Sequence, residues 1–346
     1  MSALAPPRVF AARRPLAWTA LALFPLLAIT LGVMFGGASA VGPVESLRAM
    51  VGLPALSTPA AIVDTLVFDV RLPRALLLAL AGAALAVGGA VLQSCLQNPL
   101  ADPSLLGLSG GASLGAVAAY TSGLALAWPP SVPLGAFLGA LAAVGAVYVT
   151  AHAAGRPTAG ALLLTGVAVA SLCASLVSVL LIAEGGHRVH EIFAWLLGSA
   201  ERSTWQLVQL AVVPVLLGTT GLILLRRVAD ALALGEEHAL SVGVDVLRAR
   251  AVLLALVALS AGSAVSVVGP VAFVGLMVPH LVRPIAGPAA RALLPAAALA
   301  GAGFLVMCDL LARIASRTVD LPVGIVTALM GVPFFLALLH RMRAQG

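Results

Sequence analysis

Long uninterrupted runs of apolar residues dominate the sequence, and short polar segments separate them. An apolar run of about 18 or more residues without charges is the pattern of a helix that crosses a lipid bilayer. We therefore expect an all-α polytopic membrane protein. The pattern predicts ten such helices, at residues 16–37, 67–96, 104–126, 132–153, 158–183, 205–225, 247–268, 270–286, 293–316 and 323–341.

Three segments depart from this simple pattern. Residues 189–198 (VHEIFAWLLG) are too few to cross a bilayer and predict a short helix within a loop. The span 67–96 is longer than a bilayer requires, which predicts tilt or protrusion. Residues 232–250 (LALGEEHALSVGVDVLRAR) place acidic and basic side chains at helical spacing, and a lipid-embedded segment does not carry such side chains. We expect this last segment to contact another protein; a solvated loop is the alternative.

Composition supports the membrane assignment and argues against other classes. Of the 346 residues, 61% are hydrophobic and 9% are charged, whereas soluble domains carry about 25% charged residues. All 19 basic residues are arginines, and the net charge is +6. Arginines at the membrane surfaces account for that charge without nucleic acid as a partner. Cys95, Cys173 and Cys308 stand singly in apolar stretches, a spacing that fits neither a disulfide nor a metal site.

The distribution of arginines predicts an orientation in the membrane. With the N-terminus in the cytoplasm, the inside segments hold twelve arginines and the outside segments seven, which follows the positive-inside tendency. Both termini and the segment 232–250 then face the cytoplasm. The run 16–37 exceeds the apolar core of a signal peptide, about 7–15 residues, so we expect a retained first helix.

The two halves of the chain share a small-residue rhythm. Residues 74–93 resemble residues 250–270 in composition and spacing, and on the predicted orientation they cross the membrane in opposite directions. Inverted repeats of this kind are common in transporters. The pattern therefore favours two inverted five-helix halves, with Ala, Gly and Leu composition alone as the alternative explanation.

Two other functional classes leave weak signals. Asp309 is the only carboxylate well inside a predicted span, as the ion-binding group of an ion-coupled secondary carrier would be. The tetrapeptide GLSG places Ser109 in a context found in intramembrane serine proteases, with His152 or His280 as the base. Because the chain has 35 glycines, such a tetrapeptide arises easily by chance.

Five blocks carry a more specific signal. They are RLPRALLLALAGAALAVGGAVLQSCLQNPLADPSLLGLSGGASLGA (71–116), FAWLLGS (193–199), LGEEHALSVGV (234–244), VVGPVAFVGLMVPHLVR (267–283) and DLPVGIVTALMGVPFF (320–335). Together they resemble the membrane permeases of ATP-binding-cassette (ABC) importers for iron chelates, haem and vitamin B12. The resemblance runs from about residue 65 to the C-terminus, with the blocks in family order.

The resemblance implies a ten-helix type II importer subunit, a single permease domain over residues 1–346 that works as a homodimer. It also implies two separate ATPase subunits as partners. ATP cannot be bound here by a GxxxxGK[ST] loop, because that loop needs a lysine and this chain has none. In such permeases a cytoplasmic segment between helices six and seven binds in a cleft of the ATPase. Here that coupling segment spans about 230–246, with contact residues Gly235, Glu236, Glu237, His238, Ala239, Leu240, Ser241, Val242 and Gly243.

At the outer end, the resemblance assigns three arginines to docking. Arg71, Arg74 and Arg313 match positions at which these permeases meet acidic residues of a periplasmic substrate-binding protein. Exposed cations outside run against the positive-inside tendency, and complementary charge steers docking. Anchoring to lipid headgroups, or pairing with Asp69 or Asp320, is the alternative.

At the cytoplasmic end, the resemblance assigns a gate. Asn98 and Leu100, together with Thr158, would constrict the end of the solute pathway. The match is short there, and Ala159 stands where relatives often keep a small hydroxyl residue, so this chain lacks that polar group at the predicted gate.

The outer loop GGHRVHEIF supplies candidate cargo contacts. His187 and His190 stand three apart and could face an iron centre, and Arg188 could meet a carboxylate; a hydrated loop is the alternative. These residues favour haem as cargo over a ferric siderophore or cobalamin. We expect no catalytic residue, resident metal or stably bound cofactor, and we expect the protein in the inner membrane.

Overall fold

All ten predicted membrane segments are helical in the computed structural model, which describes residues 9–36, 41–56, 58–153, 158–184, 188–315 and 321–343, with side chains described between residues 15 and 340. Within these ranges, eight helical stretches are long and apolar enough to cross a bilayer. They contain α1 (Val9–Met34), α4 (Leu72–Cys95), α7 (Ser131–Ala153), α8 (Ala159–Ala183), α10 (Trp205–Leu224), α13 (Val246–Val268), α15 (Ala290–Ala315) and α16 (Val323–Arg343).

Two of the ten segments form shorter helices than predicted, α5 (Leu108–Thr121) and α14 (Val274–Ala286). The prediction was too long because the backbone breaks inside each apolar run. Gly107 adopts a φ of 76° between the 3-10 turn η2 (Pro103–Leu106) and α5, and Phe273 adopts a φ of 68° just before α14. At 1.5 Å per residue, the 13 residues of α14 reach roughly two thirds of the way across a hydrocarbon core of about 30 Å.

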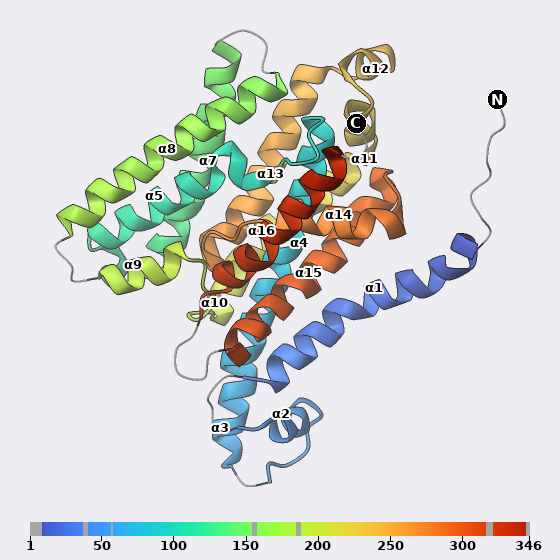
Figure 1. Ribbon diagram of the computed structural model, residues 1–346. Helices are drawn as coiled ribbons and strands as arrows, with labels where there is room; N and C mark the ends of the chain where they lie inside the picture. The colour runs from blue at the N-terminus through green and yellow to red at the C-terminus, as the bar shows by residue number, and fades with distance from the viewer. Residues whose placement is uncertain are drawn as a thin grey trace.

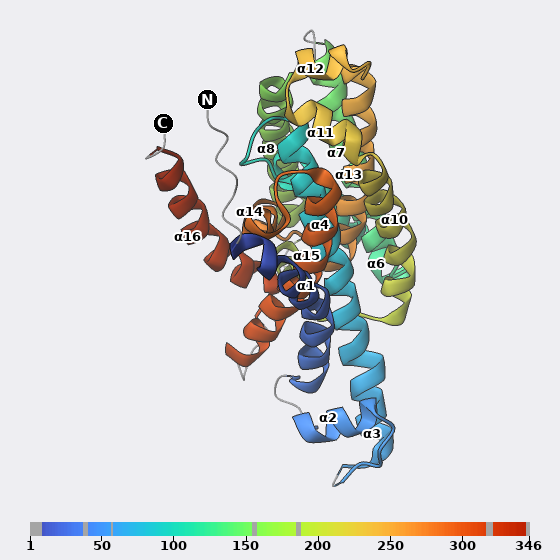
Figure 2. The same cartoon turned by 90° about the vertical axis from the view of Figure 1, so that its right-hand side faces the viewer.

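The helix at the start of α4 extends beyond the bundle, as the length of span 67–96 predicted. Helix α3 (Ala60–Asp64), the π-helical turn η1 (Thr65–Arg71) and α4 form one continuous rod of 36 residues. Pro73 explains the widened turn, because a proline lacks the N–H and crowds the carbonyl one turn earlier. Figures 1 and 2 show α3 and α2 (Pro43–Met50) projecting from one end of the molecule.

The opposite end carries the remaining short polar helices. Helices α11 (Arg226–Ala233) and α12 (Glu236–Ser241) follow α10 directly, and both views place α12 at the far end from α2 and α3 (Figures 1 and 2). We call these the α12 end and the α2 end. Helix α9 (Val189–Leu196) and the short α6 (Leu124–Ala127) border a cavity together with the start of α10. The indole N–H of Trp205, the first residue of α10, donates to the carbonyl of Phe68 in η1 at 3.0 Å, so this cavity lies toward the α2 end.

Glycines allow the buried helices to pack at backbone contact. Helices α4, α13 and α15 form the core, with 78%, 72% and 67% of their most apolar windows buried. A methyl group on Gly82 of α4 would overlap the carbonyl of Gly301 in α15. Helices α5 and α7 likewise meet through Gly111 against Gly139 and Gly115 against Gly135, the small-xxx-small spacing typical of membrane helix contacts.

Candidate functional sites

The coupling segment is a compact pair of short helices at the α12 end. Helices α11 and α12 join at Gly235, whose φ of 116° is accessible mainly to glycine. Within α12, Ala239 is fully buried. Leu234, Leu240 and Val242 are instead 70%, 59% and 57% exposed. The segment therefore presents a mixed apolar and charged surface outside the bundle, as expected for a protein contact.

Two polar contacts fix this segment to the membrane helices. The carboxylate of Asp230 in α11 accepts a hydrogen bond of 2.7 Å from the backbone N–H of Ala290, the first residue of α15, where a helix N-terminus favours a negative charge. Glu236, the first residue of α12, forms an ion pair of 2.7 Å with Arg250 of α13. The segment is thus tied to α15 and α13 and is not a loose loop.

The predicted gate residues Asn98 and Leu100 lie in the tight turn that follows α4. Oδ1 of Asn98 accepts a hydrogen bond of 2.9 Å from the N–H of Leu100, and Gln97 adopts a left-handed φ of 47°. The side-chain amide of Gln97 lies against Gly235 of the coupling segment. The structure therefore brings the predicted gate turn and the predicted coupling segment together. Thr158, the third gate residue, is exposed and caps the N-terminus of α8.

A buried carboxylate beside the gate turn, Asp102, caps the 3-10 turn η2 and contacts α14. Asp102 accepts hydrogen bonds from the backbone N–H of Ser104 at 2.9 Å and from its hydroxyl at 2.6 Å. The backbone of Gly275 and Leu276, in the first turn of α14, also hydrogen bonds with this carboxylate. Burial raises the pKa of Asp102 above its ordinary value, and these hydrogen bonds oppose the shift.

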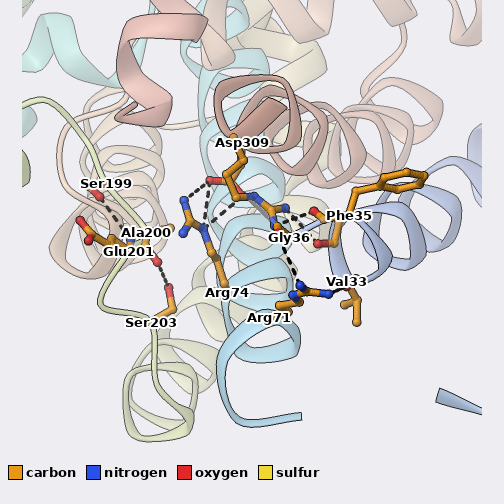
Figure 3. Close-up of polar contacts among 12 residues, drawn as sticks. Val33, Phe35, Gly36, Arg71, Arg74, Ser199, Ala200, Glu201, Ser203 and Asp309 are labelled. Carbon is orange, nitrogen blue, oxygen red and sulfur yellow. Dashed lines mark hydrogen bonds and ion pairs between the residues drawn. The ribbon is translucent and has the colours of Figure 1, made fainter. Parts of the chain in front are cut away.

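Arg71 is buried at the α2 end and binds backbone carbonyls. Its guanidinium donates to the carbonyl oxygens of Val33 at 3.1 Å, Gly36 at 3.2 Å and Val41 at 3.1 Å, and to the hydroxyl of Ser46 at 2.7 Å. Figure 3 shows Arg71 directed at this turn. Carbonyls at a helix C-terminus have no partner within the helix, so Arg71 supplies partners for the end of α1 and the turn after it.

Asp309 of α15 is the shared counterion of two further arginines. Its carboxylate lies 2.8 Å from the guanidinium of Arg74 and 3.0 Å from that of Arg313, and it is 1% exposed; Figure 3 shows Arg74 directed at Asp309. Arg313 also donates to the carbonyls of Phe35 at 2.8 Å and Gly32 at 2.9 Å. Helices α1, α4 and α15 therefore meet in one polar cluster.

The prediction that Arg71, Arg74 and Arg313 are exposed cations is wrong for all three. Arg71 is 5% exposed and Arg313 is 6% exposed, and the side chain of Arg74 is 12% exposed. Pairing with Asp69 or Asp320 was the stated alternative, yet the acid that pairs with Arg74 and Arg313 is Asp309. Asp320 lies outside the described residues. The physical reason is that the end of α1 folds over these guanidinium groups, a contact across 35 or more residues that sequence spacing cannot reveal. Docking stays a prediction.

The outer loop contributes charged residues to a cavity of about 580 Å³ at the α2 end. His190 is exposed, and the guanidinium of Arg188 donates to the carbonyl of Tyr120 at 3.2 Å. Arg202 pairs with Glu191 at 3.2 Å, and this hydrogen-bonded carboxylate raises the pKa of Arg202. His187, also predicted as a cargo contact, lies outside the described residues.

The serine and histidines of the protease hypothesis have separate environments. A ring nitrogen of His280 hydrogen bonds with the carbonyl of Leu276 at 2.9 Å. His152 stacks on Tyr148 with ring centroids 6.2 Å apart. Ser109 instead lines a separate open cavity beside Pro270 and Leu329. Ser109 and the two histidines therefore each make contacts unrelated to a catalytic pair.

These features are those of a polytopic helical permease subunit with an exposed polar segment at one end. The chain belongs to the FecCD transport family, whose model matches residues 23–341. It is an ABC importer permease with the type II importer fold, a multi-pass protein of the inner membrane. Family membership confirms the predicted resemblance and sets aside the secondary carrier.

Individual relatives support this assignment and differ in cargo. The chain is 44% identical to the cobalamin import system permease protein BtuC of Halobacterium salinarum, over 80% of this chain and 74% of that protein. It is 40% identical to the hemin transport system permease protein HmuU of Yersinia pestis, over 80% and 84%. A solved inward-facing structure of a metal-chelate type ABC transporter matches with a TM-score of 0.81 and 28% identity, over 94% of this chain and 99% of that one.

Proposed function

We propose that this permease imports a metal-containing chelate and that a separate ATPase subunit drives it through the coupling segment. The observation that carries this proposal is the exposed surface of α12, anchored to α13 by an ion pair of 2.7 Å. An ATPase bound to that surface moves a segment already joined to the membrane core. The lack of lysine in the chain supports a separate location for ATP hydrolysis, because a phosphate-binding loop requires that residue.

Two copies of the chain form the working unit in this proposal. Helices α8 and α16 have only 17% of their most apolar windows buried, the smallest share among the described spans. Their exposed leucines and valines need an apolar neighbour, and a second copy can supply part of it. Solute then passes between the two copies.

We propose that the binding protein docks at the α2 end. Arg74 is the most exposed of the three predicted docking arginines, at 12% of its side chain. Arg71 and Arg313 would take part only if the end of α1 moves, because both are buried beneath it. On the predicted orientation, the α2 end is periplasmic and both chain termini are cytoplasmic.

We propose haem as the first cargo to test, because His190 is exposed beside a cavity at the α2 end and imidazole is a common iron ligand. Cobalamin is the second candidate, since a cobalamin permease is 44% identical. A ferric siderophore is the third. The cavity between Ser109 and Leu329 has a volume of about 680 Å³, within the range typical of small-molecule pockets.

The experiment compares cargoes in one preparation. The complex is purified from its native membrane through a tag on this chain and reconstituted in vesicles with its binding protein. We expect ATP-dependent accumulation of haem, lowered by about threefold or more in His190→Ala, a loss of the size of one modest contact. His152→Ala, at an exposed site on another helix, is the matched control and should leave uptake unchanged.

Two results would contradict the proposal at different levels. Accumulation by this chain alone, without nucleotide, would disprove an ATPase-driven mechanism. ATP-dependent uptake of cobalamin or a ferric siderophore but not of haem would retain the importer and reject haem as cargo.

A further inference from the structure

One buried arginine outside the predicted sites contacts two functional elements. Arg250 lies in the first two turns of α13 and is 4% exposed. It shares a helical face with Leu253, Leu254 and Val257, which are also buried. A charge on the buried face of a helix is costly unless it is paired and hydrogen bonded, so its partners indicate its role.

The partners of Arg250 come from the coupling segment and from the helix that bears the gate turn. Its guanidinium forms the 2.7 Å ion pair with Glu236, the first residue of α12. It also hydrogen bonds with the thiol of Cys95, the last residue of α4. Gln97, two residues beyond Cys95, lies against Gly235, next to Glu236. Arg250 thus links α12 to the end of α4, and the gate turn that follows α4 lies next to the start of α12.

The geometry of the Arg250–Glu236 ion pair favours a role in transmitting movement over a role in stability alone. Glu236 is 44% exposed on its side chain, whereas that of Arg250 is 5% exposed. A buried ion pair often adds little net stability, because desolvation offsets the attraction. The planar guanidinium, however, can hold two partners at fixed angles, which a lysine ammonium does not do. It therefore constrains α12 and the end of α4 to move together.

We propose that Arg250 is a positioning residue that couples movement of α12 to the gate turn after α4. This inference rests on the proposed function, since it assumes that an ATPase moves α12. It adds the element through which that movement reaches the pathway. With the link intact, displacement of α12 changes the position of residues 97–100. Without it, α12 moves and the turn does not follow.

The test separates ATP hydrolysis from transport in the reconstituted complex. Arg250→Met removes the charge and keeps an apolar side chain of similar length, and Glu236 stays hydrated because it is half-exposed. We expect ATP hydrolysis within about twofold of the unmodified complex and solute uptake per ATP lower by about tenfold, a typical size for coupling between two sites. Arg248→Met, an 88% exposed arginine on the same helix, should change neither quantity.

Arg250→Lys keeps the charge and should give an intermediate loss of uptake per ATP. If the methionine variant does not assemble, this lysine variant tests whether Arg250 couples α12 to the gate turn. Unchanged uptake per ATP in both variants would overturn the inference. Hydrolysis and uptake falling together in the lysine variant would also overturn it, since that indicates a structural role only. Failure of the unmodified complex to couple uptake to ATP would instead reject the proposed function.

Discussion

At the scale of single residues, the structure assigns the one carboxylate deep in a predicted span to a structural task. Asp309 balances the charges of Arg74 and Arg313, and Arg313 in turn donates to the carbonyls of Gly32 and Phe35 at the end of α1. A cation near the C-terminal end of a helix stabilises it by about 0.3–2 kcal/mol. An ion-coupled carrier would need Asp309 available to a transported ion, and here two guanidinium groups occupy it.

We predict that Asp309→Asn destabilises the protein by about 3–5 kcal/mol, the cost of leaving buried charges without their partner. The measurement is the fraction folded during titration with a denaturing detergent. Asp69→Asn, at an exposed position near the α2 end, should shift that curve by no more than about 0.5 kcal/mol. Equal effects of the two substitutions would show that the cluster around Asp309 contributes no more than a surface carboxylate.

At the scale of elements, close backbone contacts decide which helices are neighbours. Water is absent from the hydrocarbon core, so apolar side chains gain nothing from meeting each other instead of lipid, and packing decides association. Gly82 and Gly301 permit α4 and α15 to touch, and Gly89 on α4 does the same with Gly275 on α14. Helix α4 therefore lies at the centre of the bundle, with the docking candidates at its start and the gate turn at its end.

We predict that Gly82→Ala destabilises the bundle by about 1–3 kcal/mol, the usual cost of overpacking, because the added methyl group meets the backbone of Gly301. Gly145→Ala in α7 is the control, since nothing lies within 4 Å of a methyl group there. That substitution should be neutral or stabilise by up to about 1 kcal/mol through helix propensity. Detergent unfolding curves measure both, and a neutral Gly82→Ala would contradict the close contact between α4 and α15.

At the scale of the whole molecule, the two ends differ in what they present. The α12 end carries a segment fixed to α13 and α15 and open to a partner. The α2 end carries the projecting rod (Figures 1 and 2). The charged outer loop and the start of α10, which hydrogen bonds with this rod at Phe68, line the cavity there. A subunit with two different ends can receive solute from one partner and motion from another.

We predict that these ends lie on opposite sides of the membrane, with α12 in the cytoplasm. Ser241→Cys and Glu201→Cys place single thiols at exposed positions of the two ends. In spheroplasts, a membrane-impermeant maleimide should label position 201 directly and position 241 only after permeabilisation. The native Cys95, Cys173 and Cys308 are buried, so the unmodified protein serves as the background control. The reverse labelling pattern would contradict the membrane orientation that the distribution of arginines predicts.

Much of the architecture could be predicted because it follows from local sequence. The short helix predicted at 189–198 is α9, and the coupling segment predicted at about 230–246 contains the end of α11 and all of α12. Helices α5 and α14 are shorter than predicted because residues with positive φ, Gly107, Gly123 and Phe273, interrupt their apolar runs. An apolar pattern reports burial in lipid or protein and does not report such torsions.

For the candidate sites, the sequence predicted the positions of motifs but not the contacts between them. The motifs predicted a coupling segment and a gate turn, but they gave no signal that the two lie next to each other at Gln97 and Gly235. Arg250 could have been suspected, since it stands on the apolar face of its helix with Leu253 and Val257. Its pairing with Glu236 could not, because 14 residues and a change of helix separate them.

The sequence by itself determined that this is a multi-span helical membrane protein with a polar segment at one end, because apolar length and charge are local properties of a chain in lipid. Only the tertiary structure decided which charged side chains are exposed and which are buried with partners. Arg71 and Arg313 are cations in either description, and it is the fold of α1 over them that turns them from surface charges into helix-end partners. Distances between residues far apart in the chain set that outcome.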